Sequence, residues 1–337
     1  MVFLNKNPKP MNTRYQLLEL LADGKFHSGT ALGSSLGISR SAVWKSLRRL
    51  EQIGMELDSV RGKGYRLRRP LELLDESRIR SQLDEQQADW LERLELHTEL
   101  ESTNSHLLQS RGLIGVNRSF ACLTESQSGG RGRRGRHWQS PFGRNLYLSV
   151  GWCYQSTPTQ LSALSLATAV VTLRALQSFG IGGIGLKWPN DLLWNDRKLA
   201  GILLEMSGEA GGSCHVVVGI GINLDMSDQQ GAAIDRPWVD LARIESGAEV
   251  SRNLLAGTLL NDLLALLQSY PQAGFEPWMA DWLANDGWMG RRVLLEQGNQ
   301  SLVGINRGVD AQGALLLEIN GQTQSCMAGE VSLRGVE

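Results

Sequence analysis

The N-terminal part of the chain contains short apolar runs at helical spacing. Leucines mark two predicted helices, namely Leu17, Leu18 and Leu21, then Leu32 and Leu36. Gly37-Ile38-Ser39 predicts a turn, and Ser39 is suited to cap a third helix from Arg40 to about Ile53. Three helices in this order, with a glycine-containing turn before the last, are typical of a helix-turn-helix fold.

The third predicted helix is amphipathic and is followed by a predicted hairpin. Its apolar face carries Val43, Leu47 and Leu50, and its opposite face is polar and basic. Met55–Val60 and Tyr65–Leu67 flank a glycine-rich basic tip, which predicts a β-hairpin wing. The residues expected to contact DNA are Ser39, Arg40, Ser41, Lys45, Arg48, Arg49 and Lys63.

The charge distribution also favours a nucleic-acid module. Residues 1–70 carry 13 Lys+Arg against 5 Asp+Glu, whereas the remaining chain carries 21 against 30. The net charge of −1 therefore conceals a basic block joined to an acidic body. The simpler alternative is a small helical domain whose charges only keep it soluble. The helix order, the cap, the basic face and the wing together favour DNA binding.

Beyond Arg68-Arg69-Pro70 the pattern alternates between strands and helices. Strand-like runs are Phe120–Thr124, Leu146–Val150, Leu199–Leu204 and His215–Gly219. A hairpin turn at Trp194–Arg197 is expected between Lys187–Leu193 and Lys198–Leu204. Helices are expected at Gln160–Phe179, Arg252–Tyr270 and around Pro277–Leu283. From Gly290 onward only short strands and turns are predicted.

We therefore predict an α+β protein of three modules. They are a winged helix-turn-helix domain at 11–68, a central domain with a mixed sheet at 77–286, and a small SH3-like β-barrel at 287–337. No segment is apolar enough to predict a membrane span. Four cysteines lie far apart without a C-x-x-C pair, which argues against a zinc cage or a disulfide framework. These features predict a cytoplasmic protein.

The segment Ser128–Trp138 has the most unusual composition. It alternates glycines with four arginines, which are Arg131, Arg133, Arg134 and Arg136. Guanidinium groups offer forked donors to carboxylate or phosphate oxygens, and glycines let the backbone approach a ligand closely. We expect a loop that is mobile when empty and becomes ordered around an anion. The glycine-rich Gly208–Ser213 is a second candidate for such ordering.

Three further features admit two interpretations each. Lys187-Trp188-Pro189-Asn190-Asp191 is a strand end with a turn, or it points a lysine into a site. Ser102-Thr103-Asn104 is a helix cap, or it supplies hydrogen bonds to a small polar ligand. Lys198–Glu205 and Gly219–Leu224 are core strands, or their glycines allow a flat ligand such as a purine to approach.

Taken together, these residues resemble the biotin–protein ligase family. The resemblance extends from about Leu17 to Arg334 and rests on Gly130–Arg136, Ser140–Leu146, Lys187–Asp191, Lys198–Glu205 and Gly219–Asn223. With its N-terminal module the chain is similar to the bifunctional bacterial form, which is also the repressor of the biotin operon. One departure is His137, where the family pattern has a lysine before the tryptophan.

The resemblance implies an activity and a regulatory role. The family joins biotin to ATP, forming biotinyl-5′-AMP and pyrophosphate, and then transfers biotin to a lysine of the biotin carboxyl carrier protein of acetyl-CoA carboxylase. No metal site of the protein's own is expected, and Mg²⁺ would enter with ATP, near Asp191. Biotinyl-5′-AMP would act as corepressor by favouring a homodimer that binds operator DNA.

The resemblance also assigns site residues. Lys187 and Arg133 would be catalytic, with Lys187 bridging the biotin carboxylate and the α-phosphate. Residues for biotin would be Ser102, Thr103, Asn104, Gln127, Arg131, Gly132, Arg133 and Lys187. Residues for ATP or the adenylate would be Gly130, Arg134, Arg136, Trp138, Asn190, Asp191 and Asn223. Two alternatives stay open, a regulator that senses biotin without ligating it and a lipoate-type ligase.

Overall fold

The computed structural model describes residues 13–155, 161–208, 213–244, 250–297, 300–327 and 331–335. The chain divides into two compact units. The smaller unit comprises the chain up to Leu73 together with Pro141–Gly143, and the larger unit comprises the rest. Each is described by itself. Most of the predicted mobile segment Gly208–Ser213 lies outside the described residues.

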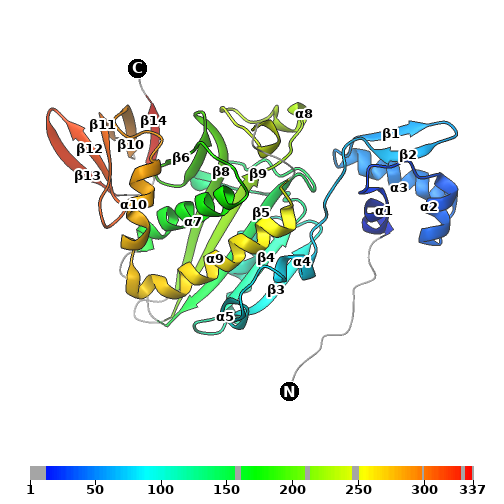
Figure 1. Ribbon diagram of the computed structural model, residues 1–337, viewed down its shortest axis with the longest axis horizontal. Helices are drawn as coiled ribbons and strands as arrows, with labels where there is room; N and C mark the ends of the chain where they lie inside the picture. Colours follow the sequence, from blue (N-terminus) through cyan, green and yellow to red (C-terminus); the bar gives the residue numbers. More distant parts are fainter. Residues whose placement is uncertain are drawn as a thin grey trace. The chain divides into compact units, whose positions relative to one another are not determined.

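The smaller unit is a winged helix-turn-helix (Figure 1). Its elements are α1 (Thr13–Leu21), α2 (Gly29–Leu36), α3 (Arg40–Gln52) and the antiparallel hairpin of β1 (Leu57–Val60) and β2 (Gly64–Leu67). The side chains of Ser28 and Ser39 accept hydrogen bonds from the first turns of α2 and α3. Gly37 ends α2 with a φ of 64°, a conformation that favours glycine. The predicted helix order, Ser39 cap and wing are confirmed.

The core of the smaller unit includes residues from two distant parts of the chain. Val43, Leu47 and Leu50 on the inner face of α3 are buried among the leucines of α1 and α2. Phe142 and Leu71 are buried in the same cluster. Gly143 adopts a φ of 66°, and a Cβ atom there would lie 2.5 Å from Leu71 Cδ1. The segment 141–143 therefore packs into the helix-turn-helix unit, although it follows the arginine-rich loop.

The larger unit is built on a seven-stranded mixed sheet. In the order along the sheet, the strands are β3 (Leu91–His97), β4 (Ser119–Thr124), β5 (Asn145–Tyr154), β9 (Cys214–Asn223), β8 (Arg197–Gly208), β7 (Asp191–Trp194) and β6 (Ile184–Lys187). β3 and β4 pair in parallel, and each other neighbouring pair is antiparallel. The inner strand β5 is buried along its whole length, and most of its residues are apolar.

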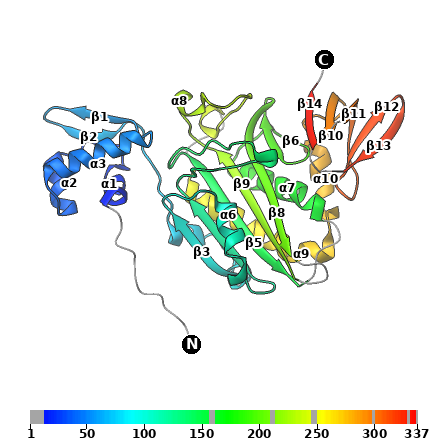
Figure 2. The same cartoon turned by 180° about the vertical axis from the view of Figure 1, so that it is seen from behind.

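Helices cover both faces of this sheet. The larger unit contains α4 (Glu76–Arg80), α5 (Glu85–Trp90), α6 (Thr103–Gln109), α7 (Leu164–Ser178), α8 (Asp228–Gly231), α9 (Arg252–Ala273) and α10 (Glu276–Asn285). The long helices α7 and α9 lie on one face (Figure 1), and α6 lies on the other (Figure 2). The predicted start at Gln160 lies outside the described residues; α7 itself begins at Leu164. Among the described residues, no helix meets the length and hydropathy needed to cross a bilayer.

The predicted hairpin arm Lys187–Leu193 is not one strand, whereas the alternative of a strand end and a turn at Lys187–Asp191 is confirmed. The chain forms a hairpin there, in which β6 ends at Lys187 and β7 begins at Asp191. The intervening turn holds the cis peptide bond between Trp188 and Pro189, and proline has no N–H group to continue a strand ladder. The next predicted turn is confirmed, because Asn195 and Asp196 have φ values of 48° and 60° between β7 and β8.

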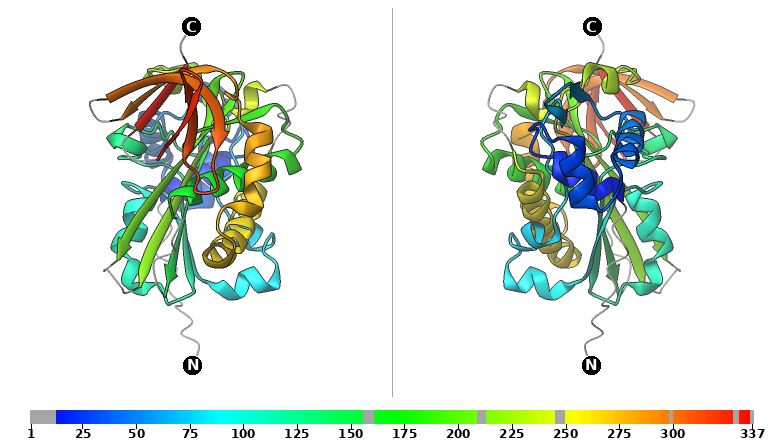
Figure 3. Two further views of the ribbon diagram at one scale, coloured as in Figure 1. Left: turned by 90° about the vertical axis from the view of Figure 1, so that its left-hand side faces the viewer. Right: turned by 90° about the vertical axis from the view of Figure 1, so that its right-hand side faces the viewer.

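The C-terminal region forms a five-stranded antiparallel sheet (Figure 3). Its order is β13 (Gln322–Cys326), β12 (Leu315–Ile319), β11 (Gln300–Val309), β10 (Arg292–Gln297) and β14 (Val331–Gly335). Apolar residues of this sheet, such as Val293 and Leu317, share one hydrophobic core with α7 and α10. The predicted third module is thus packed into the larger unit, and the domain boundaries given above stay predictions.

A buried ion pair joins distant parts of the larger unit. Glu125 follows β4, and Arg252 begins α9; the Oε2 and Nη1 atoms of the two side chains lie 2.9 Å apart. Both side chains are almost completely excluded from solvent. Glu125 Oε1 also accepts a 2.7 Å hydrogen bond from the backbone of Leu74, where the chain enters this unit. One carboxylate therefore organises three segments.

We expect Glu125→Gln to lower the free energy of unfolding by about 3–5 kcal/mol, because it leaves a buried guanidinium without its carboxylate. Urea unfolding of the full chain measures this. Asp228→Asn is the matched control, since Asp228 is 99% exposed in its pair with Arg243 and its loss changes stability by about 1 kcal/mol or less. Equal effects of the two substitutions would contradict the prediction.

Candidate functional site

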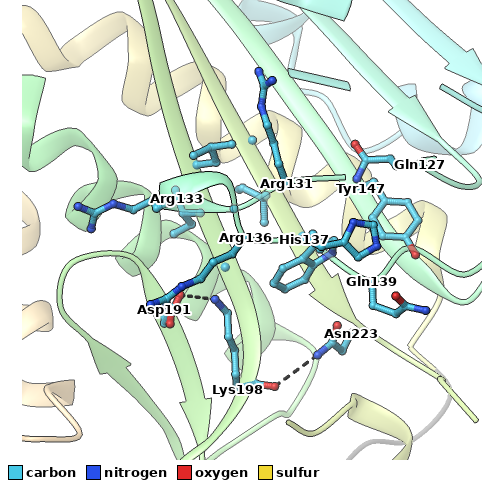
Figure 4. A pocket seen from close by; sticks show the side chains of 18 of the residues that line it. Gln127, Arg131, Arg133, Arg136, His137, Gln139, Tyr147, Asp191, Lys198 and Asn223 are labelled. Atoms are coloured by element: carbon cyan, nitrogen blue, oxygen red, sulfur yellow. Dashed lines mark hydrogen bonds and ion pairs between the residues drawn. The ribbon is translucent and has the colours of Figure 1, made fainter. Parts of the chain in front are cut away.

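A cavity of about 410 Å³ lies where α6, the arginine-rich loop and the sheet meet (Figure 4). Its walls come from the start of α6, from β5, β7, β8 and β9, and from the segment 233–238. Twelve residues predicted for the site line this cavity, namely Ser102, Thr103, Asn104, Gln127, Arg131, Gly132, Arg133, Arg136, Trp138, Asn190, Asp191 and Asn223. Residues spread over more than 120 positions of sequence are thus brought together.

Two glycines form a flat part of the cavity wall, and the indole of Trp138 lies across it. A Cβ atom on Gly221 would lie 2.6 Å from the Trp138 ring, and one on Gly201 would lie 3.1 Å from it. These residues are register partners on β9 and β8. The glycines were expected to admit a flat ligand, but in the structure a side chain of the protein itself occupies this position.

A polar network crosses the start of α6. Thr103 donates through its backbone N–H (2.9 Å) and its hydroxyl (3.2 Å) to Gln127 Oε1. The Ser149 hydroxyl lies 2.7 Å from Thr103 Oγ1 and 2.6 Å from Asn104 Oδ1. Asn104 Nδ2 donates to Glu205 Oε2 at 2.9 Å. Ser102 caps α6, so its predicted cap role is confirmed, and it also lines the cavity.

Carboxylates of the protein pair with two of the cations around the cavity. Arg131 Nη2 lies 2.9 Å from Glu205 Oε1, and Lys198 Nζ lies 2.6 Å from Asp191 Oδ1. Burial, together with the charges of Arg134 and Arg136, lowers the pKa of Arg133. The lining contains five cationic side chains but two carboxylates, so its local charge suits an anionic ligand.

The arginine-rich loop adopts a defined turn in the structure. Gly132 N–H donates to Arg136 O at 2.7 Å, and Arg131 and His137 form an antiparallel bridge. Within the turn Arg134 has a φ of 59°. Arg134 and Gly130 do not line the cavity, unlike the neighbouring residues of the loop. The predicted mobility of this loop stays a prediction.

Lys187 packs against an aromatic ring close to the cavity. It is absent from the lining of the cavity, and its Nζ atom lies 4.0 Å from the centroid of the Trp288 ring. Burial lowers the pKa of Lys187 to about 8; Asp191 acts to raise this pKa, and the positive charges of Lys198, Arg236 and Arg136 act to lower it. Lys187 therefore lies within electrostatic reach of residues that line the cavity, and its catalytic role stays a prediction.

The sequence interpretation missed several lining residues. Lys198 is the most informative, because it stood at the start of a run interpreted as a core strand. The predicted turn at Asn195-Asp196 was a usable signal, since it brings β8 back along β7, where Lys198 forms its ion pair with Asp191. Arg236 and Trp238 lie in a segment with no predicted element, and nothing local indicated their role.

The smaller unit presents a second candidate site. Arg40, Ser41, Lys45, Arg48 and Arg49 are exposed on α3, as is the capping residue Ser39, and Lys63 is exposed at the tip of the wing. Arg48 Nη1 pairs with Glu51 at 3.0 Å. The sequence interpretation missed Trp44, which is 50% exposed on the same helix with the guanidinium of Arg48 5.3 Å from its ring centroid.

Comparison with known proteins defines the class. Residues 97–223 match the Biotin/lipoate A/B protein ligase family, residues 13–66 match an HTH domain, and residues 289–334 match the Biotin protein ligase C terminal domain. A solved biotin protein ligase from Aquifex aeolicus, in complex with biotin and ATP, has a TM-score of 0.60 at 25% identity. The matched region covers 73% of this chain and the whole of the Aquifex aeolicus chain. The fold is thus that of a ligase joined to a DNA-binding domain.

Full-length relatives refine this class. The bifunctional ligase/repressor BirA of Salmonella typhimurium is 44% identical over 95% of this chain and 97% of its own length. The biotin–[acetyl-CoA-carboxylase] ligase of Mycobacterium tuberculosis is 35% identical over 79% of this chain and 97% of its own length. The chain belongs to the biotin–protein ligase family, in the bifunctional ligase/repressor form.

Proposed function

We propose that the cavity joins biotin to ATP and then transfers the biotinyl group to a lysine of a biotin carboxyl carrier protein. A biotin carboxylate oxygen attacks the α-phosphorus, the bond from that phosphorus to the β-phosphate oxygen breaks, and pyrophosphate leaves. The neutral lysine amine then attacks the acyl carbon, loses a proton, and displaces AMP. The observation that carries this proposal is the cationic cavity beside a polar helix terminus.

Both reactants of the first step are anions, so the site has to offset their repulsion. Arg131, Arg133 and Arg136 approach the cavity from the loop, and Lys198 approaches from β8 (Figure 4). Preorganised cations of this kind stabilise charge that develops in the transition state. Carboxylate oxygens are preferred ligands of Mg²⁺, so Asp191 is suited to hold the ion that accompanies ATP. The ion would neutralise phosphate charge.

The polar network at the start of α6 suits the ring system of biotin. Thr103, Asn104 and Gln127 provide hydroxyl and amide groups on one side of the cavity, and Ser102 adds a second hydroxyl. The indole of Trp138 supplies an apolar surface against which the aliphatic tail can pack. Burial of each CH₂ group there is worth about 0.8 kcal/mol. Asn223 lies away from Gln127, beside Lys198 (Figure 4), and together with the lining residue Asn190 it would contact the nucleotide.

Two lysines compete for the role of bridging the biotin carboxylate and the α-phosphate. The resemblance assigns this role to Lys187, whereas the cavity geometry favours Lys198. Lys198 lines the cavity and carries its ammonium group 2.6 Å from Asp191, a neighbour that a ligand anion could replace. Lys187 instead faces the ring of Trp288. We infer that Lys198 contacts the reacting groups.

We expect Lys198→Met to slow single-turnover adenylate formation by about 100–1000-fold, as for the loss of one preorganised donor. Lys187→Met tests the role that the resemblance assigns to Lys187, and Arg174→Met, at a residue of α7 that does not line the cavity, is the control that should keep the wild-type rate. Labelled biotin with ATP measures adenylate, and a carrier domain added to the same gel measures transfer. A larger loss of rate in Lys187→Met than in Lys198→Met would show that Lys187 bridges the biotin carboxylate and the α-phosphate. Faster reaction with labelled lipoate than with biotin would favour a lipoate-type ligase.

The second proposed activity is repression through DNA binding by α3 and the wing. An exposed basic helix face suits the major groove, and a basic hairpin tip suits the adjacent backbone. The arrangement of Lys45, Arg49 and Lys63 on exposed surface supports this proposal. DNA affinity should then depend steeply on salt, because each neutralised phosphate releases counterions.

We expect Lys45→Ala to reduce the salt-dependence slope of binding to a mixed-sequence duplex by about 0.9, the contribution of one phosphate contact. Fluorescence anisotropy at several salt concentrations gives this slope. Arg174→Ala is the matched control, since Arg174 lies on α7 of the larger unit and pairs with Asp281. An unchanged salt-dependence slope in Lys45→Ala would show that Lys45 of α3 does not contact a DNA phosphate, and would contradict the proposed interface.

Repression by one helix-turn-helix unit per chain further suggests a homodimer on a palindromic operator. Biotinyl-5′-AMP can favour that dimer only if it binds the dimer better than the monomer. A ligand that orders the arginine-rich loop would lower the entropy cost of dimerisation. We expect sedimentation velocity to show a tighter dimer with the adenylate than without it. An unchanged monomer–dimer equilibrium would exclude the adenylate as the dimerising signal.

A further inference from the structure

Four metal-binding side chains gather on the α6 side of the sheet, outside the cavity. Glu95 and Cys122 are register partners on the parallel strands β3 and β4, so their side chains share one face. His97 lies two residues after Glu95 and shares that face as well. His106 comes from α6, which covers it. None of the four lines the cavity described above.

The distances among these groups are short. Glu95 Oε2 lies 2.9 Å from His97 Nε2 and 2.8 Å from His106 Nε2. The two imidazole rings meet edge to face with centroids 4.9 Å apart. One ligand atom from each of His97, His106 and Cys122 lies within 4.8 Å of the others. Imidazole, thiolate and carboxylate donors are thus concentrated in a volume suited to a single ion.

We propose that His97, His106, Cys122 and Glu95 bind one Zn²⁺ ion. Two imidazoles, one thiolate and one carboxylate form a four-coordinate set of the nitrogen, sulfur and oxygen donors that zinc takes. The set is also electrically neutral with a divalent ion, because the thiolate and the carboxylate each contribute one negative charge. Mg²⁺ and Ca²⁺ require mainly oxygen ligands and are not suited to it.

Small side-chain movements suffice to close the site. Tetrahedral bonds of about 2.0 Å to nitrogen and about 2.3 Å to sulfur place the ligand atoms roughly 3.3–3.7 Å apart. For His97, His106 and Cys122 the present limit of 4.8 Å is about an ångström longer, and Glu95 already contacts both histidines. His97 and His106 are 29% and 27% exposed, so both rings can rotate and an ion can reach them from solvent. Cys122 is fully buried beneath them and closes the site from inside.

The remaining contacts of the cluster support its geometry. Arg93 holds the other carboxylate oxygen of Glu95 at 2.7 Å and so orients Oε2 toward the histidines. The ring of His106 also meets the ring of Phe120 edge to face. A bound ion would tie α6 to β3 and β4 three residues after Thr103. The spacing of cysteines gave no sign of this site, because its ligands come from three separate elements.

The test uses Co²⁺ as a spectroscopic probe in untagged, full-length protein treated with chelator. We expect one equivalent of Co²⁺ to give the visible absorption of a tetrahedral site and the near-ultraviolet band of a cobalt–thiolate bond. Cys122→Ser should abolish the thiolate band. His106→Gln should weaken Co²⁺ and Zn²⁺ binding by about tenfold or more in competition with a chromophoric chelator.

His215→Gln is the matched control. His215 Nε2 lies 3.7 Å from Cys153 Sγ, so this pair is a second cysteine–histidine contact in the described chain, and its loss should leave both bands unchanged. His106 is partly exposed, so His106→Gln keeps the test valid if the buried Cys122→Ser fails to fold. Absence of the thiolate band in the wild type, or its persistence in His106→Gln with unchanged affinity, would overturn the proposal.

Discussion

Repulsion between like charges is the constraint on which the larger unit depends. Five cationic side chains line one cavity, and without ligands they would repel one another and favour hydration over packing. The fold limits this repulsion with carboxylates at contact distance, as in the pairs Arg131–Glu205 and Lys198–Asp191. The cations still outnumber the carboxylates of the lining, so the cavity keeps an excess of positive charge that attracts a carboxylate or a phosphate.

The register of the sheet determines where the charged residues and the arginine-rich loop lie. Asp191 and Gly201 are partners in the register of β7 and β8, and Gly201 is in turn the partner of Gly221 on β9. Because the two glycines lack side chains, Trp138 lies directly on the backbone of the sheet. The loop that carries the arginines is anchored through this contact at its far end. Rigid strands therefore position the loop, and the loop positions the cations.

Sequence patterns predicted the structure correctly where it depends on interactions between residues that are close in the sequence. The cap at Ser39, the apolar face of α3 and the turn at Asn195-Asp196 depend on near neighbours, and each was found from the sequence. The side chain that faces the cavity depends on distant segments. Lys187 and Lys198 look equivalent in sequence, yet Trp288, about a hundred residues later, stacks on one of them. The packing of the C-terminal module could not be predicted from the sequence either, because this module shares its hydrophobic core with the distant helices α7 and α10.

Chain connectivity adds a relation between ligand binding and the helix-turn-helix unit. Trp138 and Gln139 line the cavity, whereas Pro141–Gly143 belongs to the smaller unit. One residue, Ser140, separates these two groups. Phe142 is buried in the core of the smaller unit, and Gly143 beside Leu71 has a φ of 66°, a conformation that favours glycine. A ligand that ordered the arginine-rich loop would therefore act on a stretch of chain that ends one residue before a segment fixed in this core, and this short connection would allow the order of the loop to affect the smaller unit.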